Sequence, residues 1–240
     1  MKTVYITIII ISLLASVGIT IITRTTSSVP QTTEVVVLRD VTEKNLLEPN
    51  PDEILGLFDL TNNAYSGAHF RFANISNVSY NVEQQVKIEA TGKWLSNELD
   101  RQKEIEDFQN GVKKILADAK SDSIGRSHSS VYLPIARELI RLSQSKSGRC
   151  ILIIYSDLME NTADISFYDK KTFNLLQSNS QILKNIFEKE EPLPSLEGIG
   201  VYFIFQPTTE ENDTAYRVVS EFYKTLLEDK GAKVSIRTNL

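Results

Sequence analysis

Cysteine and histidine are nearly absent from this chain of 240 residues. The one cysteine, Cys150, excludes an intrachain disulfide framework and any zinc site built from several cysteines. The two histidines, His69 and His128, leave little for histidine-based metal catalysis. No glycine-rich phosphate-binding loop is present either, which argues against a P-loop nucleotide hydrolase. Any metal bound here would therefore need oxygen ligands.

An excess of positive charge is also lacking. The chain has 26 Lys and Arg against 31 Asp and Glu, a formal net charge of −5. This acidic balance argues against a nucleic-acid-binding surface, so we expect no nucleic-acid partner. Hydrophobic residues at 41% and charged residues at 24% are ordinary globular values, which argue against extensive disorder.

Charge is missing altogether from residues 4–22, which are dominated by Ile, Val and Leu. The length of this run fits the roughly 17–25 residues of a membrane-spanning helix, so residues 1–24 are predicted to be a signal anchor. A cleaved signal peptide with Ser16 and Gly18 before the cleavage site is the alternative, and it would give a secreted protein. Lys2 and the terminal amine outweigh Arg24, which predicts a single-pass membrane protein whose soluble part is extracytoplasmic.

The segment after the anchor is rich in Ser and Thr. Residues 25–33 cannot form a core and are predicted to be a short tether. Residues 34–240 are then expected to form one domain. Without Lys2 and Arg24, 24 basic residues stand against 31 acidic ones, so this soluble part carries a net charge of −7.

The expected domain alternates strands and helices. Strands are predicted at 35–38, around 70, around 86, at 151–155, at 199–205 and around 234–236. Helices are predicted from about Pro51, over 96–119 with Leu99 on its apolar face, from Pro134, over 172–189, and over 214–229 before Gly231. The strands near 70 and 86 are separated only by a turn-rich stretch, which predicts a hairpin.

These elements predict the fold class. Unbroken apolar runs at 35, 151 and 199 are typical of central parallel strands, which are buried on both faces. Helical crossovers separate most successive strands, as parallel pairing requires. We therefore expect a three-layer α/β/α sandwich, Rossmann-like, with about six mostly parallel strands and one antiparallel edge strand.

Carboxylates and hydroxyls follow the central strands. In open α/β sheets ligands bind outside the carboxyl ends of the strands, where the strand order reverses. Asp40 follows the first strand and Asp157 follows the strand at 151–155, with hydroxyls at Thr42, Ser129 and Ser130. Oxygen-only clusters of this kind suit Mg²⁺, Mn²⁺ or Ca²⁺, so a divalent cation is the expected cofactor.

These residues also resemble a known family. The order of elements, together with Asp40-Val-Thr42, Ser129-Ser130 and Ser156-Asp157, resembles a von Willebrand factor type A-like domain over about residues 34–240. In that family an Asp-x-Ser-x-Ser motif, a Thr and a later Asp form a metal-ion-dependent adhesion site. The resemblance implies that Asp40, Thr42, Ser129 or Ser130, and Asp157 hold a metal, and that an acidic group of a protein partner completes its shell.

Two positions depart from the family pattern. Lys44 stands where the second hydroxyl of the first motif is expected, and Leu158 replaces the Gly that usually follows the last Asp. Two interpretations of Lys44 remain open. Its ammonium group points to solvent and a cation binds, or it folds over the Asp40–Asp157 pair and replaces the cation by relieving their repulsion.

The loop after Asp157 holds further candidates. Glu160, Asp164 and Asp169, with Glu43 opposite, form either an acidic rim for cations or a basic partner, or an ordinary solvated loop. Phe167 and Tyr168 are either exposed anchors for a partner or residues packed under the loop. His128 lies between serines, but no nucleophile elbow accompanies it.

Three functions from different classes follow. The first is a membrane-tethered binding or assembly module that meets a protein partner, without enzymatic activity. The second is a metal-free scaffold in which Lys44 seals the site. The third is a phosphohydrolase of the haloacid dehalogenase type, which would need Asp-x-Asp after the first strand, where Thr42 occupies the second position.

Overall fold

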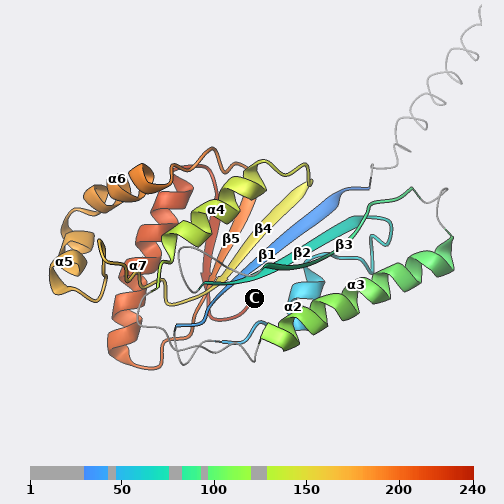
Figure 1. The fold of residues 1–240 in the computed structure, drawn as a ribbon, viewed down its shortest axis with the longest axis horizontal. Coiled ribbons are helices and arrows are strands. Elements are labelled where there is room, and N and C mark those ends of the chain that lie inside the picture. The colour runs from blue at the N-terminus through green and yellow to red at the C-terminus, as the bar shows by residue number, and fades with distance from the viewer. Residues whose placement is uncertain (1–29, 43–46, 76–82, 93–96, 120–128) are drawn as a thin grey trace, which may run out of the picture.

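A mixed sheet organises the fold, and the computed structural model describes the chain in residues 30–42, 47–75, 83–92, 97–119 and 129–240. Within these ranges six strands lie in the order β3-β2-β1-β4-β5-β6 (Figure 1). Their bounds are β1 Thr32–Asp40, β2 Gly67–Ile75, β3 Glu83–Ile88, β4 Arg149–Tyr155, β5 Ile199–Ile204 and β6 Lys233–Arg237. Helices cover both faces of the sheet, so the predicted three-layer α/β/α, Rossmann-like fold is confirmed.

The strand directions set the place of a possible site. β1 pairs in parallel with β2 on one side and with β4 on the other. β3 pairs antiparallel to β2 at one edge, which confirms the predicted hairpin, and β6 forms the opposite edge in parallel with β5. The chain passes outward through β2 and β3 before it returns to β4. The strand order therefore reverses between β1 and β4, the point at which open α/β sheets bind ligands.

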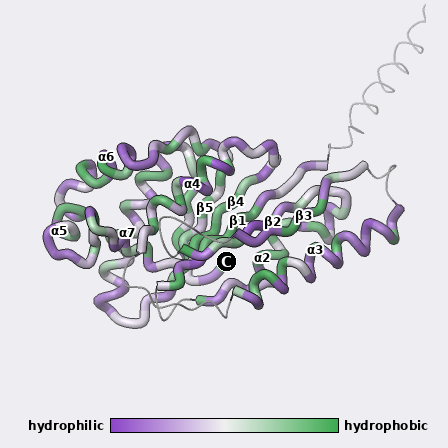
Figure 2. The backbone as a smooth tube through the Cα atoms, in the orientation of Figure 1, coloured by the Kyte–Doolittle hydropathy of each residue, from purple (hydrophilic) through white to green (hydrophobic). Residues whose placement is uncertain are grey.

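The central strands are hydrophobic on both faces because both faces are covered. Val35–Leu38 and Ile151–Ile154 are almost entirely buried, and Figure 2 shows hydrophobic residues concentrated along the central strands. β1 begins at Thr32, two residues inside the segment expected to be a tether. The part of that segment before Pro30 lies outside the described residues.

Two sets of helices cover the sheet (Figure 1). One face carries α2 Pro51–Gly56 and α3 Glu98–Ala119. The other carries α4 Tyr132–Ser143, α5 Lys170–Ser178, α6 Ser180–Glu190 and α7 Glu210–Glu228. Pro134 was expected to open α4, but the helix begins at Tyr132. Because the first turn leaves its N–H groups without intrahelical partners, the missing N–H of Pro134 costs nothing there.

The first turn of α3 differs from the prediction. Leu99 was expected on the apolar face but is 79% exposed. Arg101 takes the inward position and is 3% exposed, because its guanidinium donates hydrogen bonds to the carbonyl oxygens of Ala64, Ser66 and Glu89. Residues two apart on a helix point to nearly opposite sides, so an inward Arg101 turns Leu99 to solvent.

The single helix expected over 172–189 is two helices. Asn179 between α5 and α6 has φ −154° and ψ 68°, which interrupts the helical backbone. Ser178 donates its hydroxyl hydrogen to the carbonyl oxygen of Asn174. Ser and Asn side chains compete with the helix for backbone groups, and Ser178-Asn179-Ser180 is a run of such residues. α7 also begins earlier than expected, at Glu210, because Thr209 caps its first turn.

An ionic cluster lies between β2 and α4. Arg71 is 1% exposed and pairs with Glu34 at 3.1 Å and with Glu138 of α4. Glu83 on β3 lies 3.8 Å from Arg71 and also pairs with Arg141. Buried charges are tolerated only when they are paired, so this cluster fixes α4 against the hairpin side of the sheet.

Candidate functional site

The carboxyl ends of β1 and β4 meet through a hydrogen bond between side chains. Arg39 lies opposite Tyr155 in the β1–β4 register, so Asp40 lies level with Ser156. The Ser156 hydroxyl donates to Asp40 Oδ2 at 2.9 Å. Thr42 donates to Asp40 Oδ1 from its backbone N–H at 2.9 Å and from its hydroxyl at 2.6 Å. The structure thus brings Asp40 and Thr42 together, with Ser156 as an additional partner.

Asp157 is held by the loop that follows it. Its Oδ1 accepts the N–H of Met159 at 2.9 Å, and its Oδ2 accepts the Tyr168 hydroxyl at 3.4 Å. Leu158, which lies between Asp157 and Met159 in the chain, has a positive φ of 63°. Non-glycine residues adopt this backbone conformation rarely. Leu158 is also fully buried, so packing in the core stabilises this turn.

Ser129 and Ser130 lie at the same edge, beside the loop after β4. Backbone hydrogen bonds of 3.1 and 2.8 Å join Ser129 to Asn161 in a short antiparallel bridge. Both serines are buried, with 5% and 4% exposed. The hydroxyl oxygen of Ser129 has no hydrogen-bond partner among the residues that the structure describes.

Glu160 was expected either in an acidic rim or in an ordinary solvated loop, and its burial shows that both expectations are wrong for this residue. It is 2% exposed and accepts hydrogen bonds from the N–H groups of Val131 and Tyr132 and from the Tyr223 hydroxyl. Burial raises the pKa of the Glu160 carboxyl to about 7, although these hydrogen bonds oppose the shift. Glu160 thus supplies the N-terminal cap that α4 lacks locally, since Val131 makes no side-chain cap.

A sequence signal for Glu160 does exist. α4 begins without a Ser, Thr, Asp or Asn at its cap position, and its first turn contains no acidic residue. A helix with an uncapped start needs acceptors from elsewhere in the chain. The sequence does not say which distant acidic residue supplies them, because the pairing depends on the tertiary contact between α4 and the loop after β4.

The other candidate residues of this loop differ in how far they are exposed to solvent. Asp164 and Asp169 are exposed, and Asp169 caps α5 by accepting the N–H groups of Lys171 and Thr172. Phe167 is 1% exposed, whereas Tyr168 is 59% exposed. Phe167 is therefore a core residue and Tyr168 a surface aromatic.

The oxygen donors suit a hard cation. Asp40 and Asp157 supply carboxylates, and Thr42, Ser129 and Ser130 supply hydroxyls. A carboxylate has about four acceptor positions, and the described residues fill three of those of Asp40. Among the described residues no group of three His, Cys, Asp or Glu side chains is placed to hold a metal. Lys44, Glu43 and His128 lie outside the described residues.

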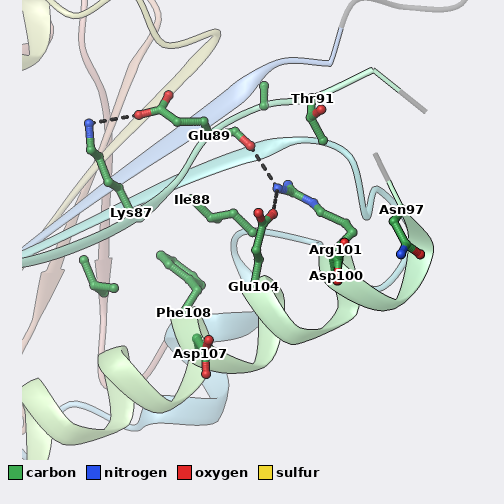
Figure 3. Close-up of a pocket in the computed structure, with 12 residues that line it drawn as sticks. Lys87, Ile88, Glu89, Thr91, Asn97, Asp100, Arg101, Glu104, Asp107 and Phe108 are labelled. Atoms are coloured by element: carbon green, nitrogen blue, oxygen red, sulfur yellow. Dashed lines mark hydrogen bonds and ion pairs between the residues drawn. The ribbon is translucent and has the colours of Figure 1, made fainter. Parts of the chain in front are cut away.

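A separate cavity of about 670 Å³ lies between β3 and the start of α3 (Figure 3). Arg101, with Glu104 3.0 Å away, lies at its wall, and four of its five guanidinium N–H groups are directed to Glu104 and the three carbonyl oxygens. This arginine fastens α3 to the hairpin. Residues 93–96 are outside the described part of the chain.

Comparisons with known proteins give no further identification. Neither a family model nor a curated protein matches the chain. Among the described residues no helix is both long and apolar enough to cross a membrane. The predicted anchor at residues 4–22 lies outside those residues.

Proposed function

We propose that this chain is a binding module whose site comprises Asp40, Thr42, Ser129, Ser130 and Asp157. In this proposal the site takes a divalent cation, Mg²⁺ or a similar hard ion, and through it a protein partner. The hydrogen bond from Ser156 to Asp40 carries the proposal, because it joins the carboxyl ends of β1 and β4 at the point where the strand order reverses.

The electrostatics of Asp40 support a cation. This carboxylate is 1% exposed, and its partners in the described part of the chain are two hydroxyls and one backbone N–H. A buried carboxylate is accommodated where a positive charge lies beside it or where donors contact its oxygens. These described donors are all neutral, and a cation bound to Asp40 would add a positive charge.

The metal-free scaffold remains the second candidate, and one observation favours it. Three hydrogen bonds already hold Asp40 in place, so its position does not depend on an ion. In this alternative the Lys44 ammonium supplies the charge. The two candidates differ in what they predict for added metal.

The chain direction suits a tethered module. β1 starts at Thr32 on the amino edge of the sheet and ends at Asp40 on the carboxyl edge (Figure 1). A strand of nine residues spans about 30 Å. If residues 4–22 anchor the chain in a membrane, the domain joins its anchor at the edge opposite the candidate site, which would leave that site free for a partner.

Thermal melting of the full-length chain in a non-ionic detergent tests the cation. We expect 10 mM Mg²⁺ or Mn²⁺ to raise the melting temperature by about 3 °C or more relative to EDTA, because a ligand that binds only the folded state stabilises it. Asp40→Asn and Asp157→Asn should abolish the shift. Asp164→Asn, an exposed acid in the same loop, is the matched control and should retain it.

The same measurement separates the scaffold. If the wild-type chain shows no shift and Lys44→Ser gains one, Lys44 replaces the cation and the scaffold is supported. No shift in either chain would rule out metal binding at this edge.

A further inference from the structure

The loop after β4 presents an exposed aromatic ring on a fixed backbone. The Phe167 N–H donates to the Glu160 carbonyl oxygen at 2.9 Å, and the Asp169 N–H donates to Ser166 at 3.1 Å. The Phe167 ring packs 6.1 Å from Phe222 in the core. Tyr168, the next residue, is 59% exposed. Because the loop is held from both sides, ordering Tyr168 on binding costs little conformational entropy.

Tyr168 borders a groove of about 820 Å³. The loop after β4 and helix α5 form one side of this groove, and the first turn of α7 forms the other. We call it the α5–α7 groove, and its lining residues include Met159, Phe167, Tyr168, Lys170, Phe173, Glu210 and Glu211. Met159 and Phe173 are partly buried and pack against the core, so part of the groove is apolar. The groove adjoins the candidate site, because Met159 and Tyr168 both donate hydrogen bonds to Asp157.

The groove is acidic at its α7 side. Glu210 and Glu211 are exposed there, and Lys170 is the one basic residue among those that line it. Asp213 in the same turn is already paired with Arg217 at 2.9 Å. The exposed Asp169 lies between Tyr168 and Lys170 in the chain and adds to the negative charge.

We propose that the α5–α7 groove binds a segment of a partner protein in which an apolar side chain is flanked by Lys or Arg. The apolar side chain packs against Met159, Tyr168 and Phe173, and the basic groups face Glu210 and Glu211. A second copy of this chain is disfavoured, because a symmetric contact would bring two acidic grooves together on domains of net charge −7. The inference deepens the proposed function and rests on this chain being a binding module, but it does not require the cation.

The test uses fluorescence anisotropy of labelled peptides with the full-length chain in non-ionic detergent and EDTA. The probe peptide has a Leu-Trp pair flanked by arginines, and the matched peptide has glutamates in their place. We expect the arginine peptide to bind about tenfold more tightly than the glutamate peptide. Tyr168→Ser and the double variant Glu210→Lys/Glu211→Lys should each weaken binding by about fivefold or more.

The double variant Glu98→Lys/Glu106→Lys is the control, since it makes the same charge change at exposed positions on α3, across the sheet. It should leave the affinity within about twofold. Equal weakening by the control, equal binding of both peptides, or no binding at all would overturn the proposal. So would self-association of the chain that Glu210→Lys/Glu211→Lys abolishes, because a second copy would then occupy the groove.

The proposed cation site and the groove can fail independently. Peptide binding in EDTA without any Mg²⁺-dependent melting shift would support the groove and reject the cation. A melting shift without peptide binding would reject the groove and leave the cation site supported.

Discussion

At the scale of single residues, the register between β1 and β4 decides which side chains are in contact at the carboxyl ends of these strands. Asp40 and Asp157 both follow central strands, but the β1–β4 register places Ser156 opposite Asp40. Asp157 then turns toward Met159 and Tyr168. Successive residues of an extended chain point to opposite sides, so an offset of one residue changes the partner. The sequence motif therefore indicates which edge of the sheet holds the candidate site, and the β1–β4 register decides which side chains are in contact there.

Glu160 makes stability depend on pH. The folded-state pKa is about 7, above the ordinary value of 4.5, so the folded state binds the proton more tightly than the unfolded chain. The contribution of this group is therefore greatest below pH 4.5 and is lost as the pH rises through 7. The shift corresponds to about 3 kcal/mol.

Urea unfolding at pH 5 and pH 8 measures this contribution. The wild-type chain should lose more stability between these pH values than Glu160→Gln, which keeps an acceptor for the N–H groups of α4 but cannot ionise. Asp164→Asn, at an exposed position, should behave as wild type. The same pH dependence in wild type and Glu160→Gln would show that Glu160 does not titrate in this range.

At the scale of elements, buried polar groups decide where helices start, break and attach. Arg101 fastens the start of α3 to backbone carbonyl groups, and Glu160 caps α4 from a distant loop. The strands and the hairpin were predictable because the spacing of hydrophobic residues along the chain, and the length of each hydrophobic run, depend directly on which faces of an element are buried. These polar contacts were not, because each joins residues far apart in the chain. The break at Asn179 was also missed, although Ser178-Asn179-Ser180 is a run of poor helix formers.

The attachment of α4 to the sheet gives a prediction at this scale. Arg71→Met should destabilise the fold by about 3–5 kcal/mol, because it leaves Glu34 and Glu138 without their buried partner. Arg141→Ala removes a half-exposed arginine from the same cluster and should cost about 1 kcal/mol or less. Chemical denaturation of both variants checks the difference. Similar losses for the two would show that burial does not distinguish these arginines.

At the scale of the whole molecule, the fold separates the start of the chain from the candidate site. Thr32 is the first residue of β1, whereas Asp40 ends β1, Asp157 follows β4, and Ser129 bridges to Asn161 in the loop after β4. The carboxyl edge of the sheet also carries the α5–α7 groove. The fold class and this edge were predictable from the order of elements. The ligand was not, because the chemistry at the edge depends on the charge beside Asp40, and Lys44 lies outside the described residues.

Direct counting of bound Mn²⁺ tests the central claim most directly. The electron paramagnetic resonance signal of free Mn²⁺, recorded during titration of the full-length chain, should report about one bound ion per chain at submillimolar to millimolar Mn²⁺. Binding should disappear in Asp40→Asn and in Asp157→Asn and persist in Asp164→Asn. The absence of bound Mn²⁺, or binding that survives both site variants, would contradict a cation site at the carboxyl ends of β1 and β4.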